Sequence, residues 1–186
     1  MSKCKMMKKL IMAALVAVAS VSANAQYWAG GEVGFNTSRT SLDGHTLGKE
    51  NQVTLAPEVG YKLNDKWDVA VKLEYEHMDE KHGTNANGFA FNPYVRYTYF
   101  KSGKFTAFID GGFSYGFIHE SGVDDNLNLW QIALNPGISY GLTDKVGLVA
   151  HVGDLSWTFA KQGDVKNNTF DLGVTNAITF GAYVNF

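Results

Sequence analysis

The chain has 186 residues, with 16 Lys and Arg against 18 Asp and Glu, and a single cysteine, Cys4. One cysteine excludes a scaffold held by internal disulfides and a metal site built from cysteines. The slightly acidic balance argues against nucleic-acid binding. With 20 Gly, 13% aromatic residues and only 3 Pro, the composition indicates an all-β chain rather than a disordered one.

The first 25 residues have the features of an export signal that is removed. Four lysines precede an apolar run at 10–21, and the segment ends in Ala23-Asn-Ala25, the small-x-small pattern that signal peptidase recognises. The apolar run is shorter than the roughly 20 residues that span a bilayer as a helix. We therefore predict a cleaved signal peptide at 1–25 and a mature domain at 26–186. The signal holds four of the 16 basic residues and no acidic ones, which leaves 12 against 18 and a formal charge of −6.

From residue 27 onward, apolar residues alternate with polar or small ones, the period of a β-strand with two different faces. The alternation predicts eight strands at 27–38, 51–63, 67–78, 88–100, 105–117, 129–142, 146–159 and 170–186. In the seventh span the apolar residues change from even to odd positions near Gly153. One extra residue restores the register, so we predict a β-bulge there.

The connections between these spans alternate in length. Residues 64–66, 101–104 and 143–145 are expected to form tight turns, whereas 39–50, 79–87, 118–128 and 160–168 are expected to be long polar loops. The predicted fold is therefore all-β, an eight-stranded antiparallel up-and-down barrel. Short turns on one side and long loops on the other are typical of outer-membrane barrels, whose short side is periplasmic.

A five-residue pattern, P-x-[VI]-x-Y, occurs three times, each time before a predicted tight turn. It begins at Pro57, Pro93 and Pro136, which are the three prolines of the chain. Spacing of this kind indicates a repeated hairpin. Because proline has no N–H to donate to the strand ladder, each one predicts a local gap or bulge in the sheet.

Charged residues in the predicted strands fall on one face only. They include Glu32, Glu58, Lys62, Asp68, Lys72, Glu74, Glu76, Arg96, Asp110 and Asp171. A soluble barrel would carry such charges outside and keep its apolar face inside. A charged residue facing lipid costs roughly 2–4 kcal/mol at the bilayer midplane for Arg or Lys. An apolar face without charges, with aromatic residues near both ends of the strands, predicts a barrel whose outer wall meets lipid.

The signal peptide, the proline hairpins and the ending Ile178-Thr-Phe-Gly-Ala-Tyr-Val-Asn-Phe186 together resemble the small eight-stranded outer-membrane β-barrel family, of the OmpX and OmpA-barrel type of porin-family proteins. The resemblance covers residues 26–186, and the proline hairpins are most similar to those of Bacteroidetes members. It implies a location in the outer membrane of a Gram-negative bacterium. It also implies that Phe186, Val184, Ala182 and Phe180 form the C-terminal signal that the barrel-assembly machinery reads.

Five lumenal charges are expected near one height: Glu32, Glu58, Lys72, Arg96 and Asp110. An eight-stranded barrel is only wide enough for its side chains to fill, so these charges should pair with one another or with water. Acids outnumber bases by three to two, so one carboxylate needs water, Tyr94 or His151 as its partner. The main interpretation is a polar network that plugs the lumen; a narrow or gated ion path and a ligand site are the alternatives.

Enzymatic activity is a further alternative, because some eight-stranded barrels modify lipids. Such an enzyme needs a nucleophile beside a base, and His151 and Ser156 are the nearest such pair in sequence. We predict a non-enzymatic barrel without a catalytic, metal or cofactor site. Its expected role is structural or surface-interacting, with a porin-like channel for ions or small solutes as the alternative. The expected partners are outer-membrane lipids and lipopolysaccharide, the barrel-assembly machinery and an unidentified extracellular loop partner, but no nucleic acid.

Overall fold

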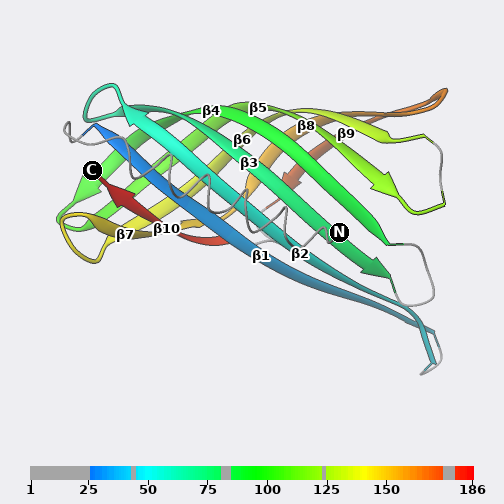
Figure 1. Ribbon diagram of the computed structural model, residues 1–186. Helices are drawn as coiled ribbons and strands as arrows, with labels where there is room; N and C mark the ends of the chain where they lie inside the picture. Colours follow the sequence, from blue (N-terminus) through cyan, green and yellow to red (C-terminus); the bar gives the residue numbers. More distant parts are fainter. Residues whose placement is uncertain (1–25, 43–44, 81–84, 123–124, 174–178) are drawn as a thin grey trace, which may run out of the picture.

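A computed structural model gives the fold, and it describes residues 26–42, 45–80, 85–122, 125–173 and 179–186 (Figure 1). The predicted signal peptide lies outside the described residues. The strands are β1 (Tyr27–Leu42), β2 (His45–Lys62), β3 (Trp67–Glu80), β4 (Ala86–Ser102), β5 (Phe105–Glu120), β6 (Leu127–Gly141), β7 (Val146–His151), β8 (Asp154–Gln162), β9 (Val165–Gly173) and β10 (Thr179–Asn185). The described part of the chain contains no helix long and apolar enough to cross a membrane.

All strands are antiparallel and the sheet closes on itself. β6 pairs with both β7 and β8, so these two segments are the lower and upper parts of one barrel strand. β8 pairs with β9, and β7 with β10, in the same way. β10 returns to pair with β1, and β5 pairs with β6. The ten segments therefore form the closed, eight-stranded barrel that the alternation predicts.

The strands are longer, and the outer connections shorter, than predicted. β1 continues to Leu42 and β2 begins at His45, whereas residues 39–50 were expected to form a loop. The predicted loop at 160–168 is instead the end of β8, a tight turn containing Gly163 with φ 56°, and the start of β9. These strand ends are polar on both faces, so hydrophobic alternation does not mark them, although their backbones still pair across the hairpin.

The bulge near Gly153 is confirmed. His151 faces Gly137, but Leu155 faces Leu134, so β7 and β8 use one more residue than β6 over this stretch. The change allows Leu148 below the bulge and Trp157 above it to be exposed on the same outer wall.

The gaps expected at the prolines are also present. The β2–β3 ladder has no paired residues between Leu55 and Glu58, and the β4–β5 ladder has none between Phe91 and Tyr94. The third gap coincides with the bulge, where the Val152 N–H donates to the carbonyl of Pro136. On its other side each proline is itself paired, within the β1–β2, β3–β4 or β5–β6 ladder. Each proline thus interrupts only the ladder between two strands that are joined by a tight turn, which we call a turn-end connection.

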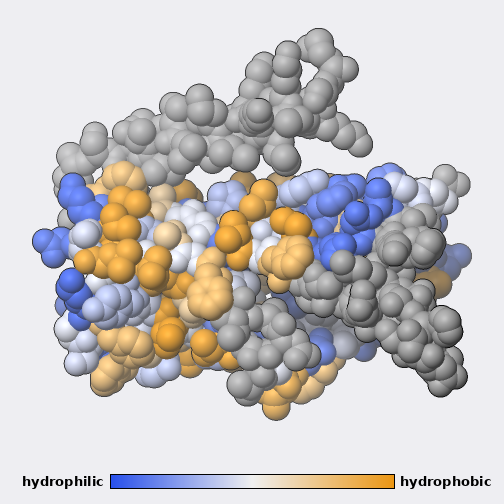
Figure 2. Space-filling model, turned by 90° about the horizontal axis from the view of Figure 1, so that it is seen from below, coloured by the Kyte–Doolittle hydropathy of each residue, from blue (hydrophilic) through white to orange (hydrophobic). Residues whose placement is uncertain are grey.

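Burial is inverted relative to a soluble protein, as the charge pattern predicts. Glu58 is 3% exposed and Arg96 8%, whereas Phe35 is 74% exposed. Figure 2 shows apolar side chains gathered on the outer wall, with hydrophilic residues toward the ends of the barrel. Aromatic rings pair across strands near both ends, with centroids 4.6 Å apart for Trp67 and Tyr97 and 5.4 Å apart for Tyr115 and Trp130.

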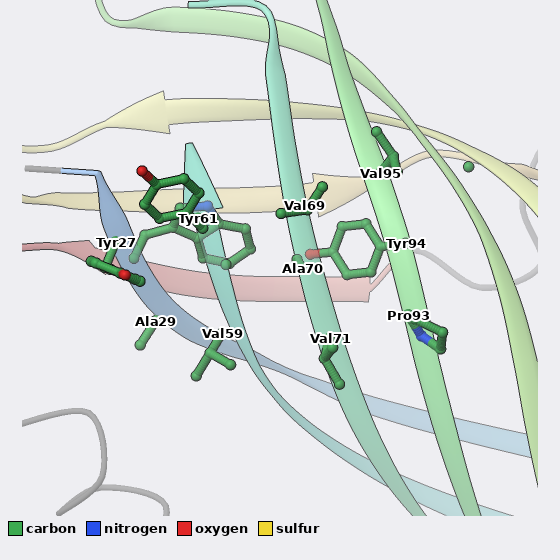
Figure 3. Close-up of a pocket in the computed structure, with 13 residues that line it drawn as sticks. Tyr27, Ala29, Val59, Tyr61, Val69, Ala70, Val71, Pro93, Tyr94 and Val95 are labelled. Carbon is green, nitrogen blue, oxygen red and sulfur yellow. The ribbon is translucent and has the colours of Figure 1, made fainter. Parts of the chain in front are cut away.

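An apolar hollow of about 710 Å³ lies near the turn end of β1 to β4 (Figure 3). Most of its lining comes from outward-facing side chains, among them Tyr27, Val59, Val71 and Val95. Val59 and Val95 are also among the exposed apolar residues of the wall. The hollow therefore belongs to the surface that faces lipid.

Candidate functional site in the lumen

The strongest ion pair of the lumen joins β4 to β5. Arg96 and Asp110 are direct cross-strand partners, and both guanidinium contacts are short: Nε to Oδ1 is 2.7 Å and Nη2 to Oδ2 is 2.7 Å. Two parallel bonds of this kind are the strong, orienting form of an Arg–carboxylate pair. The Arg96 guanidinium also lies 3.9 Å from the centre of the Phe108 ring, where a cation is attracted to the aromatic face.

A second group of contacts surrounds His151 on β7. Its Nδ1 lies 2.8 Å from Oε1 of Glu32, and its Nε2 lies 2.9 Å from Oδ2 of Asp110. Glu32 is also 3.9 Å from Nζ of Lys72. The imidazole therefore connects the Arg96–Asp110 pair to the Glu32–Lys72 pair, and the charges form one continuous cluster across the lumen.

The remaining predicted charge, Glu58, accepts a hydrogen bond from the Tyr94 hydroxyl at 2.6 Å. The structure thus brings all five predicted lumenal charges into one region, and it places Tyr94 and His151 as partners of the excess carboxylates. We call Glu32, Glu58, Lys72, Tyr94, Arg96, Asp110 and His151 the lumenal cluster. Its geometry gives each carboxylate at least one polar partner.

Three aromatic side chains lie on the turn side of this cluster, each above a glycine of the neighbouring strand. A Cβ placed on Gly60 would lie 2.2 Å from the Trp28 ring. The corresponding distances are 2.5 Å from Gly137 to Phe108 and 2.3 Å from Gly147 to Tyr183. Trp28 and Phe108 are 3% and 1% exposed, and the Trp28 indole donates to Asp68. We call Trp28, Phe108 and Tyr183 the aromatic layer.

Toward the loop end, the lumen contains two smaller cavities. One, of about 260 Å³, is lined by cluster residues and by Glu74, Asn92 and Asp154. The other, of about 200 Å³, lies next to it and shares Glu74, Ser114 and Gln131. Space therefore exists above the cluster, whereas bulky side chains occupy the lumen at the level of the cluster and the aromatic layer.

The His151–Ser156 pair considered for catalysis is not brought together. Both imidazole nitrogens face carboxylates, and the Ser156 hydroxyl donates to Asp154 at 3.0 Å. Both residues point into the lumen, where they are 8% and 2% exposed. Among the described residues, no group of three or more His, Cys, Asp or Glu side chains is arranged to hold a metal ion.

The C-terminal residues lie on the strand that closes the barrel. β10 pairs with β1 from Asn185 to Phe180, and the Phe186 N–H donates to the carbonyl of Tyr27. Phe180 and Val184 are exposed on the outer wall, at 63% and 39%, and Ala182 is exposed between them. The position is compatible with the assembly role that the resemblance implies, and that role stays a prediction.

Sequence reasoning missed the aromatic layer. Trp28, Phe108 and Tyr183 occupy lumenal positions on faces whose other residues are polar or small. The outward-facing residues next to them in sequence are also apolar, so the alternation does not make these three rings stand out. A usable signal was present in the repeat: the two variable positions of P-x-[VI]-x-Y always face the lumen. They are Glu58 and Gly60, Tyr94 and Arg96, and Gly137 and Ser139, so every repeat supplies a residue of the cluster or a glycine beneath an aromatic ring.

A closed antiparallel barrel with an apolar outer wall and a charged interior defines a transmembrane β-barrel, since closure satisfies every backbone group without water. Residues 11–176 match the family described as outer membrane protein beta-barrel domain. The chain belongs to this family, and it is an outer-membrane protein of a Gram-negative bacterium.

Solved structures share the fold at low sequence identity. Neisserial surface protein A is 16% identical, with 89% of this chain and 99% of that chain covered and a TM-score of 0.57. OprG from Pseudomonas aeruginosa is 16% identical, with 86% and 94% covered and a TM-score of 0.54. The N-terminal β-barrel domain of P. aeruginosa OprF is 13% identical, with 87% and 98% covered and a TM-score of 0.51. No curated protein matches the sequence.

Proposed function

We propose that this protein is a structural and surface-interacting barrel whose lumen is plugged by the lumenal cluster and the aromatic layer. The observation that carries the proposal is the continuous set of contacts from Lys72 through Glu32, His151 and Asp110 to Arg96. Phe108 packs against both the guanidinium and the imidazole. A pathway for solutes would have to displace charges that already have partners.

In this function the protein interacts through its outer wall and the two ends of the barrel. The outer wall takes outer-membrane lipids and lipopolysaccharide, and β10 is the element offered to the barrel-assembly machinery. The long hairpins lie at the end of the barrel opposite the tight turns (Figure 1). If the tight turns are periplasmic, these hairpins face the outside of the cell and would contact an extracellular partner. No nucleic-acid partner and no enzymatic activity are included, and comparing lipid A by mass spectrometry with and without the protein tests the latter.

Arg96→Ala tests the plug directly. Removing one member of a buried pair costs about 3–5 kcal/mol, because the remaining charge has no partner. The variant should unfold at a lower temperature and should also conduct more in planar bilayers, because Asp110 loses both guanidinium contacts. Arg96→Lys is the matched control: it keeps the charge but loses the two-bond fork, so its effects should be smaller.

Wild-type stability and conductance in Arg96→Ala would show that these charges do not hold the lumen shut. A narrow or gated channel is the second candidate function, and the cavity of about 260 Å³ above the cluster favours it. Steady single-channel conductance of the wild-type protein at neutral pH would support that function over the plug.

A further inference from the structure

His151 occupies the one position in the lumenal cluster that touches two carboxylates from different strands. Glu32 on β1 and Asp110 on β5 approach opposite nitrogens of the ring, at 2.8 and 2.9 Å. The ring also meets Phe108 edge-on, with centroids 5.5 Å apart and planes at 84°. The His151 side chain is 11% exposed, so water does not readily replace either carboxylate contact.

This geometry requires a particular protonation state. An ionised carboxylate only accepts hydrogen bonds, and a neutral imidazole has one N–H and one bare nitrogen. The Asp110 contact is a hydrogen bond and the Glu32 contact a close ion pair. Both are favourable together only when the ring carries both protons and is an imidazolium. With this charge the cluster balances: Glu32, Glu58 and Asp110 face Lys72, Arg96 and His151.

We propose that the proton on His151 is a latch that holds the lumen shut, and that its loss at alkaline pH opens the barrel. The inference rests on the proposed plug and adds a regulator to it. Without the proton, one carboxylate faces a bare nitrogen and the cluster has an excess negative charge. The neutral ring still donates one N–H, so β7 stays tied from within to only one of the two strands, β1 or β5.

The groups around His151 on the neighbouring strands favour a protonated ring at neutral pH, because most of them are acidic. The acidic ones are Glu32 on β1, Glu74 on β3, Asp110 on β5 and Asp154 on β8, and Tyr94 on β4 is a further titratable group; the basic one is Lys72 on β3. One contact further away, Arg96 pairs with Asp110 and Glu58 accepts from Tyr94. Thr179, opposite the histidine on β10, is neutral. Acid sufficient to protonate Glu32 or Asp110 would weaken the same contacts, so the shut state should occupy a window around neutral pH.

Conductance of purified protein in planar bilayers, recorded from mildly acidic to alkaline pH, tests the latch. The wild type should show a low conductance at neutral pH and a severalfold rise at alkaline pH. His151→Asn should conduct at neutral pH and lack the alkaline rise. His77→Asn is the matched control: His77 is bonded to Asn87 near the loop end, and this variant should behave like the wild type.

A second measurement separates the latch from the plug. In detergent micelles, the ¹⁵N shifts of the His151 ring should be those of an imidazolium at neutral pH and should change together with the conductance. A neutral ring at neutral pH, or an alkaline rise retained in His151→Asn, would overturn the latch and leave the plug intact. Failure of Arg96→Ala to raise conductance would instead remove the plug.

Discussion

At the scale of single residues, the lumen is packed by placing a large aromatic ring against a glycine of the neighbouring strand. The rings of Trp28, Phe108 and Tyr183 each lie against a glycine, and none of the three glycine positions has room for a Cβ. Glycine weakens a strand interior, yet here the ring of the adjacent strand covers the exposed backbone. The glycines at 60, 137 and 147 therefore have a packing role, because the absence of a side chain leaves the space that each ring occupies.

Gly60→Ala should test this fit. The added methyl group would collide with the Trp28 ring, and overpacking of a dense interior costs about 1–3 kcal/mol. The free energy of unfolding from urea titration in detergent should fall by an amount in that range, with changed Trp fluorescence. Gly141→Ala is the control, since its nearest neighbouring atom would be 3.7 Å away. Equal stability of both variants would contradict the packing role of Gly60.

Individual charges of the site could be located from the sequence because a strand has a period of two. Once the apolar face is known, Glu58 and Arg96 must point the other way, and their distance from the turns sets their height. The period does not tell which charges meet, because that depends on the stagger between strands. Thus the bridging role of His151 and the Glu58–Tyr94 bond needed the registers of several ladders.

At the scale of elements, strand existence was predictable and strand length was not. Alternation marks only the part of a strand that separates lipid from lumen. β1 continues to Leu42 and β9 begins at Val165, where both faces are polar and no contrast remains. The bulge at Gly153 could be predicted because it lies inside the apolar region, where one extra residue reverses the facing of Leu155 and Trp157.

The closing strand β10 carries a prediction about assembly. Phe186→Ala should lower the amount of protein in the outer membrane more than it lowers the stability of barrels refolded from urea into detergent. The reason is that the aromatic end is proposed to be read during insertion, whereas in the finished barrel the Phe186 N–H donates to the Tyr27 carbonyl, a backbone bond that alanine keeps. Immunoblotting of outer-membrane fractions gives the first quantity. Wild-type levels of the variant in the membrane would count against the assembly role.

At the scale of the whole molecule, closure and inversion together predict how the protein behaves in detergent. Every strand has a partner on both sides over the closed part of the barrel, and the apolar wall suits a micelle as well as a bilayer. An unboiled sample should therefore migrate differently from a boiled one in an SDS gel. Recovery of the protein from the periplasm without detergent would contradict the lipid-facing wall.

The three proline gaps have a mechanical consequence. They divide the wall into hairpins, β1–β2, β3–β4 and β5–β6. At mid-height each hairpin is continuous within itself, and its pairing with the next, across a turn-end connection, is interrupted. Four contacts of the lumenal cluster cross such a boundary: Glu58 to Tyr94, Lys72 to Glu32, Arg96 to Asp110, and His151 to Asp110. The contact from His151 to Glu32 spans β10 instead, where the ladders are continuous. The lumenal cluster therefore holds neighbouring hairpins together from inside the barrel, at the height where their backbone pairing is interrupted. Hydrogen exchange of the backbone amides next to the three gaps should therefore become faster when the cluster is disrupted.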